Sequence, residues 1–141
     1  MFGKIVVGTD GSDTASKAVQ HAAGIAAATG SELLILSAYP PPKPDAGSTF
    51  GGATPYAGPE IARSVLADAE KRLAGTAKVR TIMREGEAAD AICDLAEEEG
   101  AGLIVVGNRG MTGAKRFLLG SVPNNVSHHA PCSVLIVHTT D

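Results

Sequence analysis

The strongest constraint in this sequence is a set of short aliphatic runs that are apolar at every position. They are Ile5–Val7, Leu33–Leu36, Leu103–Val106 and Val134–Val137, with a weaker fifth at Val79–Met83. Strands of a parallel sheet covered on both faces carry such continuous runs, whereas half-exposed strands alternate. The four strong runs therefore predict buried parallel strands.

Segments with helical spacing of apolar residues lie between these runs, at about 12–28, 59–73, 86–99 and 121–130. In the second of them the apolar stripe reads Ile61, Val65, Ala69 and Leu73. Alternating strands and helices predict right-handed crossovers onto one parallel sheet with helices on both faces. We expect an α/β fold, a single doubly wound domain over residues 1–141. The acidic residues Asp94, Glu97, Glu98 and Glu99 are expected at a solvated helix end.

The amino-acid composition and net charge argue against several classes of function. The chain has 141 residues, of which 44% are hydrophobic and 19% charged, and its net charge is -3. A length of this order supports one core, and the apolar content argues against a disordered chain. Broad binding to nucleic acid or to an acidic membrane favours a basic surface, so neither partner is expected. Seventeen glycines and no tryptophan suit contact with a small ligand through main-chain groups.

Cys93 and Cys132 are far apart in sequence and form no C-x-x-C pair. Two isolated thiols fit a reducing compartment, although two cysteines can also pair. The opening residues resemble no signal peptide, so we expect a cytoplasmic protein. Cys93 falls between apolar helix positions, which favours packing over reactivity.

The segment 39–58 is rich in proline and glycine and is long for a connection inside one domain. We interpret it as a flexible loop that serves as a lid, contacts a partner or is disordered.

Ligands of open parallel sheets bind beyond the carboxyl ends of the strands, where the strand order reverses. The first such end reads Gly8-Thr9-Asp10-Gly11-Ser12. Asp-Gly-Ser is ordinary turn and helix-cap chemistry. In nucleotide folds an acid at this place also contacts the ligand sugar, so both interpretations of Asp10 stay open.

The stretch from Gly107 to Ser121 carries a second candidate. Four glycines bracket Arg109, Lys115 and Arg116, and Gly120-Ser121 opens a helix. Glycine lets the backbone approach a phosphate, successive N–H groups form an anion nest, and a helix N-terminus adds donors. Glycine loops also make plain turns, and this one is neither a Walker loop nor G-x-G-x-x-G.

The pattern Gly107-x2-Gly110-x9-Gly120-Ser121 resembles the nucleotide-binding signature of the universal stress protein family. The opening Val6–Ser12 and the closing His129–Val137 match the same family in the same order. The resemblance covers nearly the whole chain. It implies a five-stranded parallel sheet of order 3-2-1-4-5 and a homodimer through the last strand, here Val134–His138.

The resemblance also implies an adenine-nucleotide site, with ATP as the first expected ligand. Asp10 would contact the ribose or base, with Gly8 and Thr9 beside it, and Ala38 would meet adenine through its main chain. The remaining expected contacts, which line the ribose and phosphates, are Val106, Gly107, Arg109, Gly110, Gly120, Ser121 and Val122. Magnesium would be held, if at all, through the phosphates, with Asp10 and Asp13 nearby.

One departure from the family pattern concerns Pro123. Many ATP-binding members have serine or threonine there, whereas proline offers neither a hydroxyl nor an N–H donor. The run Gly120–Ser127 resembles a subgroup that prefers cyclic AMP, so cyclic AMP is the alternative ligand. Proline is also favoured in the first turn of a helix for structural reasons alone.

We identify no nucleophile with a base and no metal-binding motif, so no catalytic residue and no metal ligand is expected. The leading hypothesis is a nucleotide-binding stress-response protein that acts by occupancy. The rivals are a slow ATPase and an interaction module without a ligand.

Overall fold

The computed structural model describes residues 2–42, 56–108 and 121–139. Its helices and strands alternate as the sequence predicts, and all five aliphatic runs are strands. In chain order the elements are β1 (Lys4–Gly8), α1 (Asp13–Thr29), β2 (Glu32–Tyr39), α2 (Gly58–Arg72), β3 (Lys78–Glu85), α3 (Ala88–Glu99), β4 (Leu103–Gly107), α4 (Ser121–His129) and β5 (Ser133–Val137).

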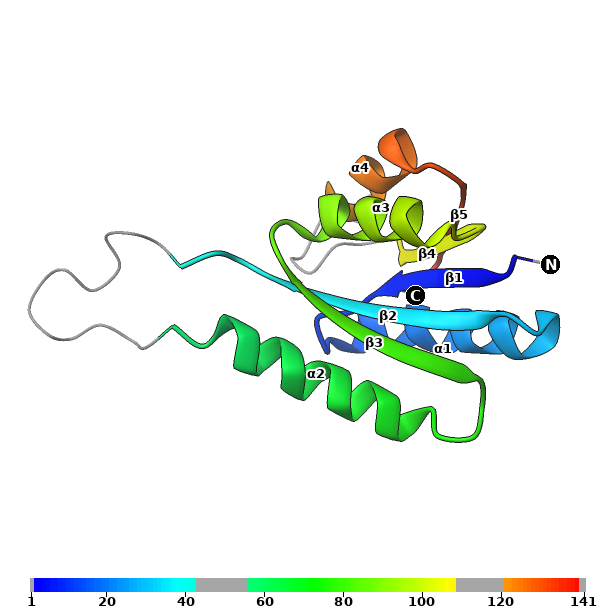
Figure 1. The fold of residues 1–141 in the computed structure, drawn as a ribbon, viewed down its shortest axis with the longest axis horizontal. Helices are drawn as coiled ribbons and strands as arrows, with labels where there is room; N and C mark the ends of the chain where they lie inside the picture. Colours follow the sequence, from blue (N-terminus) through cyan, green and yellow to red (C-terminus); the bar gives the residue numbers. More distant parts are fainter. Residues whose placement is uncertain (1, 43–55, 109–120, 140–141) are drawn as a thin grey trace, which may run out of the picture.

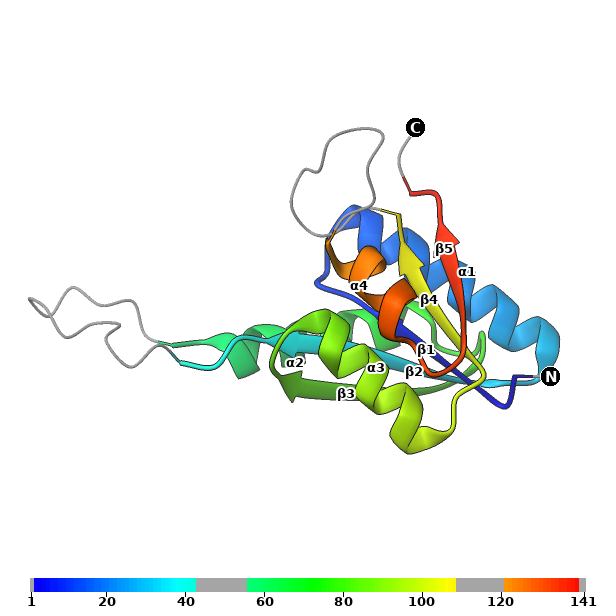
Figure 2. The ribbon, with the colours of Figure 1, turned by 90° about the horizontal axis from the view of Figure 1, so that it is seen from above.

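The strands form one sheet in the order β3-β2-β1-β4-β5, and every neighbouring pair is parallel. Helices α1 and α2 cover one face of this sheet, while α3 and α4 cover the other (Figures 1 and 2). The predicted doubly wound fold and its strand order are therefore confirmed. None of the described helices is long and apolar enough to cross a membrane.

The core has two layers, one on each side of the sheet, because successive side chains of a strand point to opposite faces. Ile5 and Val7 of β1 pack on the α1 side, whereas Val6 packs on the α3 side. All three are completely buried. Burial on both faces explains why the strand sequences are apolar at consecutive positions.

Helix α1 begins and ends where its flanking residues favour it. The hydroxyl of Ser12 accepts a hydrogen bond from the Ala15 backbone N–H at 3.2 Å, which satisfies one of the free donors of the first turn. Gly30 ends the helix in the left-handed conformation with φ of 68°, which costs glycine little. The predicted helix of about 12–28 is confirmed to within one residue.

The predicted stripe of α2 is confirmed for Ala69 and Leu73, which pack into the core, and wrong for Ile61, which is exposed. The structure buries Ala62, Leu66 and Leu73, whereas Ile61 is 62% exposed. Each step of four residues rotates the stripe by about 40°, so Ile61 and Leu73 lie far apart around the helix. The residues spaced 62, 66, 69 and 73 stay within a narrow arc and face the sheet.

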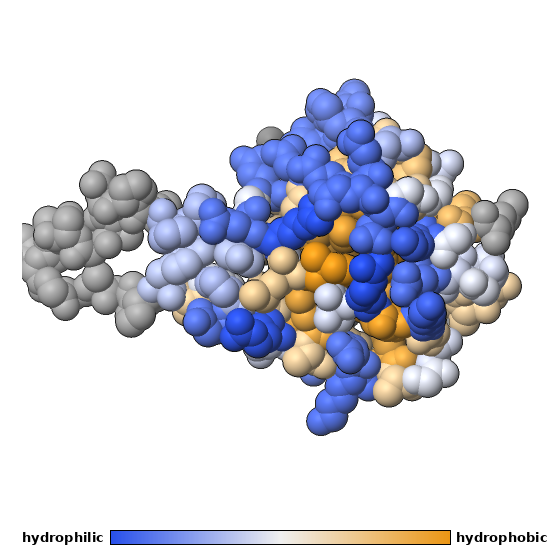
Figure 3. Space-filling model, in the orientation of Figure 1, coloured by the Kyte–Doolittle hydropathy of each residue, from blue (hydrophilic) through white to orange (hydrophobic). Residues whose placement is uncertain are grey.

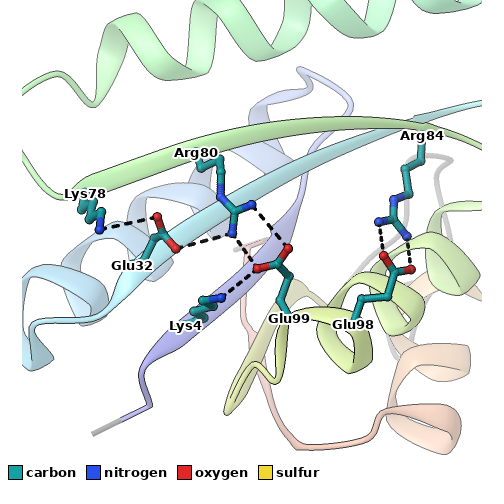
Figure 4. Close-up of polar contacts among 7 residues, drawn as sticks. All are labelled: Lys4, Glu32, Lys78, Arg80, Arg84, Glu98 and Glu99. Atoms are coloured by element: carbon teal, nitrogen blue, oxygen red, sulfur yellow. Dashed lines mark hydrogen bonds and ion pairs between the residues drawn. The ribbon is translucent and has the colours of Figure 1, made fainter.

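The end of α3 is not merely solvated, because Glu98 and Glu99 form ion pairs with edge strand β3 (Figure 4). Glu99 Oε1 lies 2.8 Å from Lys4 Nζ and 2.6 Å from Arg80 Nη2. Arg84 contacts both carboxylate oxygens of Glu98, at 2.6 and 2.7 Å. Asp94, Glu97 and Glu98 are exposed, as predicted for a solvated helix end, whereas Glu99 is half-buried. The ion pairs themselves were not predicted, since their partners come from strands distant in sequence.

These ion pairs lie on the face of the molecule where α3 meets the sheet edge. Hydrophilic side chains there form a band beside an apolar area (Figure 3). Glu32 of β2 extends the group, since its carboxylate lies 3.5 Å from Arg80 and 4.0 Å from Lys78. The network therefore links β1, β2, β3 and the end of α3.

Hydrogen bonds from Arg80 and then Lys4 lower the pKa of the Glu99 carboxyl from 4.5 to about 2. Arg84 likewise lowers the pKa of Glu98. In the unfolded chain Glu99 takes up its proton near pH 4.5, whereas in the folded protein it stays charged down to about pH 2. Its ion pairs therefore contribute stability above pH 4.5 and lose it as the pH falls to about 2.

Replacing Glu99 with glutamine should lower the urea midpoint of unfolding at neutral pH. The difference from the parent protein should shrink as the pH falls through the window from 4.5 to 2, since the parent then loses the same charge. Glu97→Gln, at an exposed position on the same helix, is the control. A difference that stays constant over this window would show that Glu99 does not act through its charge.

The close approach of α3 to the end of β1 leaves little room for a side chain at position 8. A Cβ atom there would lie 2.7 Å from Cδ1 of Ile92. Gly8→Ala should therefore destabilise the fold by about 1–3 kcal/mol, and Ile92→Val alone by about 1 kcal/mol. Because valine lacks the Cδ1 atom, the double variant should lose less than the sum of the two single losses. Denaturant unfolding of all four proteins measures this, and simple additivity would mean that the contact does not constrain residue 8.

Candidate functional site

The strand order reverses between β1 and β4, because the chain leaves β1 toward β2 and later returns on the other side of β1. The carboxyl ends of these two strands are separated there by their diverging connections, which is where open α/β sheets bind ligands. A pocket opens at this place. Its lining residues come from the ends of β1, β2 and β4 and from the first turns of α1, α3 and α4: Gly8, Thr9, Ser12, Thr14, Ala15, Leu36, Ala38, Ala88, Ile92, Val106, Gly107, Val122 and Pro123.

The pocket has an apolar side and a hydroxyl-bearing side. Leu36, Ile92 and Val106 belong to the core layer beneath α3 and α4, and they form an apolar wall. Thr9, Ser12 and Thr14 supply hydroxyl groups from the β1–α1 connection and the first turn of α1. None of the described lining residues carries a charged side chain. Such a site suits a ligand with a flat apolar part and a polar part held by main-chain and hydroxyl groups.

The connection between β1 and α1 is held by its own short-range hydrogen bonds. Thr9 donates its backbone N–H to the Leu36 carbonyl at 2.9 Å, and its hydroxyl accepts from the Gly11 N–H at 3.1 Å. One oxygen of Asp10 accepts from the Ser12 N–H at 2.9 Å. Gly11 has φ of 83°, a conformation that glycine adopts without strain. The turn chemistry expected of Asp-Gly-Ser is confirmed.

Asp10 is half-buried and lies on this connection, but it is not among the residues that line the pocket. Its second carboxylate oxygen takes part in no hydrogen bond with the described residues. The turn interpretation therefore does not exclude the ligand interpretation of Asp10, because the turn hydrogen bond uses only one of its two oxygens.

The structure brings together most of the predicted site residues that it describes. Gly8, Thr9, Ala38, Val106, Gly107 and Val122 all line the pocket. Ser121 begins α4 and is exposed, outside the lining set. The predicted contacts Arg109, Gly110 and Gly120 lie outside the described residues, as does most of the predicted loop 39–58.

Sequence reasoning missed the lining residues Ser12, Thr14, Ala15, Leu36, Ala88 and Ile92. Ala15, Ala88 and Ile92 are apolar residues of helices, and no periodicity tells a core contact from a pocket wall. A usable signal was their position in the first turns of helices that follow strand ends, since these turns point at the site.

The thiols and imidazoles of the described residues lie apart from this pocket. Cys93 and Cys132 are free, and burial raises the pKa of both thiols, which disfavours the reactive thiolate. His128 and His129 are exposed at the end of α4. Within the described ranges, no three His, Cys, Asp or Glu side chains gather closely enough to hold a metal ion.

Known proteins share both the sequence and the fold. The model of the universal stress protein family matches residues 1–138. Universal stress protein Rv1636 of Mycobacterium tuberculosis is 44% identical over 141 residues, which cover 96% of each chain. A universal stress protein solved in complex with cAMP is 35% identical, covers 99% of both chains and superposes with a TM-score of 0.76.

A universal stress protein from Archaeoglobus fulgidus, solved in complex with dAMP, is 27% identical and has a TM-score of 0.72 over 96% of this chain and 97% of its own. The family model spans almost the whole chain, and the relatives match it in both length and fold. The chain belongs to the universal stress protein family.

Proposed function

We propose that this protein binds an adenine nucleotide in the pocket between β1 and β4 and acts by being occupied rather than by turnover. The observation that carries the proposal is the pocket itself, because it combines an apolar wall with small residues at three strand ends. Gly8, Ala38 and Gly107 leave the backbone accessible to a ligand. Two relatives of the same fold have been solved in complex with adenine nucleotides, cAMP and dAMP.

The adenine base fits the apolar side of the pocket. Ile92 is 1% exposed and Leu36 is 1% exposed, so the wall they form is part of the rigid core. The base would lie against this wall, while the backbone of Ala38 offers hydrogen-bonding groups to its edge. Small residues, Ala38 and Ala88, line this side of the pocket.

The sugar and phosphate would extend toward Gly107 and the first turn of α4. Pro123 lines the pocket there and is buried, so it presents neither a hydroxyl nor an N–H donor to a phosphate chain. A compact cyclic phosphate needs fewer donors than a triphosphate. The relative solved with cAMP supports the same choice. We therefore propose cyclic AMP as the preferred ligand and ATP as the weaker one.

The absence of charged groups among the described lining residues supports binding over catalysis. A general base must lie within hydrogen-bond reach of the proton it removes. Hydroxyls are the only polar side-chain groups of the described lining, and we assign the carboxylate of Asp10, beside the pocket, to the ribose rather than to a reacting proton. Release of phosphate from ATP at rates well above background would contradict this part of the proposal and favour the ATPase.

Self-association through β5 is the second part of the proposal. This strand lies at the edge of the sheet, and Val134–Val137 carries no charge. Leu135 is 37% exposed. The opposite edge strand, β3, carries Lys78, Arg80 and Arg84, which discourage edge-to-edge pairing. The β5 edge is therefore the better candidate for a dimer contact.

Isothermal titration of the purified, nucleotide-free protein should show binding of cyclic AMP that is tighter than binding of ATP. Asp10→Ala should weaken cyclic AMP binding by about 10- to 100-fold, because a charged hydrogen bond to the ribose is lost. Asp10→Asn keeps an oxygen for the Ser12 N–H and should fold normally while binding weakly. Asp13→Ala removes a nearby exposed acid and is the matched control. If neither nucleotide binds at millimolar concentration, the proposed function is wrong.

Sedimentation measurements should give a dimer for the parent protein at micromolar concentration. Leu135→Lys places a charge in the middle of the β5 edge and should shift the protein to the monomer, since charged side chains on an edge oppose pairing. The same substitution at the opposite edge, Thr81→Lys, should leave the dimer intact. A dimer that survives Leu135→Lys would mean that another surface is used.

A further inference from the structure

Asn108, the first residue beyond β4, is tied to the segment that follows β5. Its side-chain Oδ1 accepts two hydrogen bonds from Thr139, one from the backbone N–H at 2.8 Å and one from the hydroxyl at 2.9 Å. Its own backbone N–H donates to the Val137 carbonyl at 2.8 Å. Three hydrogen bonds therefore connect the exits of two neighbouring strands. We call this set the Asn108–Thr139 link.

The link is partly buried, and α1 contributes a further hydrogen bond to it. Thr139 is a polar residue and is only 2% exposed. Its carbonyl accepts a hydrogen bond from Lys17 Nζ of α1 at 3.1 Å. Polar groups in such a place are costly unless they are paired, so the arrangement is well defined.

The link also continues the sheet past its last ladder pair. That pair joins Gly107 of β4 to Val137 of β5. Asn108 and Thr139 extend the contact beyond it with a side-chain amide, which accepts through both lone pairs of Oδ1. A residue without such an acceptor cannot hold Thr139 in this way. Gly107 lines the pocket. The hydrogen bonds between Asn108 and Thr139 therefore fix the direction in which the chain leaves this residue.

We propose that Asn108 and Thr139 are positioning residues of the nucleotide site, although neither lines the described pocket. The link holds the exit of β4 in the orientation that presents Gly107 to the phosphate of the ligand. Thr139 thereby influences how well a phosphate is bound. This inference rests on the proposed function, because it concerns the same pocket.

A purely structural role predicts a different outcome from a positioning role. If the link only stabilised the sheet, its loss would lower the stability and leave the ligand preference unchanged. If it positions the phosphate side, its loss affects ligands that carry a phosphate and spares those that do not. Adenosine and cyclic AMP share the base and sugar, so comparing them isolates the phosphate.

The test titrates cyclic AMP and adenosine into the parent protein and into Asn108→Ala, Thr139→Val and Thr139→Ser. Asn108→Ala removes the acceptor of two hydrogen bonds, and Thr139→Val removes only the hydroxyl. We expect the Kd for cyclic AMP to rise about tenfold in Asn108→Ala and about threefold in Thr139→Val, on the usual contribution of a hydrogen bond. The Kd for adenosine should stay within about twofold, and Thr139→Ser should restore the parent values.

Ser31→Ala is the matched control. Ser31 is 4% exposed and its hydroxyl shares a hydrogen bond with Thr29 at 2.7 Å, at the opposite end of the sheet. This variant should lose stability without changing either Kd. Thermal unfolding of every variant without ligand separates stability from binding.

The inference is overturned if Asn108→Ala and Thr139→Val bind cyclic AMP with the Kd of the parent protein. It is also overturned if the Kd values for adenosine and cyclic AMP rise by the same factor in these variants. If Asn108→Ala does not fold, the comparison of Thr139→Val with Thr139→Ser decides the question. If the parent protein binds no adenine nucleotide, the proposed function fails, and this inference fails with it.

Discussion

The structure depends on the burial of β1 between two layers of helices. This strand pairs with β2 on one side and β4 on the other, and its three central residues are fully buried. The other strands are joined to the sheet through β1 or through a neighbour of β1, and their side chains pack into the same two core layers. Burial on both faces also aligns the strand exits, since the parallel register places Gly8 beside Leu36 and Val7 beside Val105. The pocket follows from this alignment.

The two edge strands, β3 and β5, differ in how their unpaired backbone groups are protected from pairing with another chain. β3 exposes one edge of its backbone and protects it with arginines and lysine that pair with acidic residues of α3 and β2. β5 has no such charges within Val134–Val137 and exposes Leu135 instead. Natural sheets protect their edges with charge or cover them with another surface. The contrast gives the molecule one closed edge and one edge suited to pairing.

Most of the fold could be predicted from the sequence because continuous apolar runs have few explanations other than buried parallel strands. The face of α2 could not, since a stripe at intervals of four drifts around the helix and Ile61 looks as apolar as Leu66. The ion pairs of Glu98 and Glu99 were also beyond prediction. Their partners on β1 and β3 become neighbours only when the sheet is assembled.

The site could be predicted in part, because the positions of the strands also give the positions of their ends. Gly8, Ala38 and Gly107 stand at strand exits, so strand positions alone indicate them. Ile92 and Ala88 approach the same space from a helix, and their distance from the strand ends depends on how α3 packs. The link between Asn108 and Thr139 joins residues 31 apart in the sequence, and an asparagine and a threonine outside any motif give no signal of it.

The apolar wall of the pocket is also the core of the protein. Leu36, Ile92 and Val106 are at most 4% exposed, and each contacts the layer that holds α3 and α4 on the sheet. A ligand seated against this wall cannot stay bound when the domain unfolds, so its binding free energy adds to global stability. At a free concentration one hundred times its Kd, a ligand contributes about 2.7 kcal/mol. The lifetime of the folded chain would then rise and fall with the supply of its ligand.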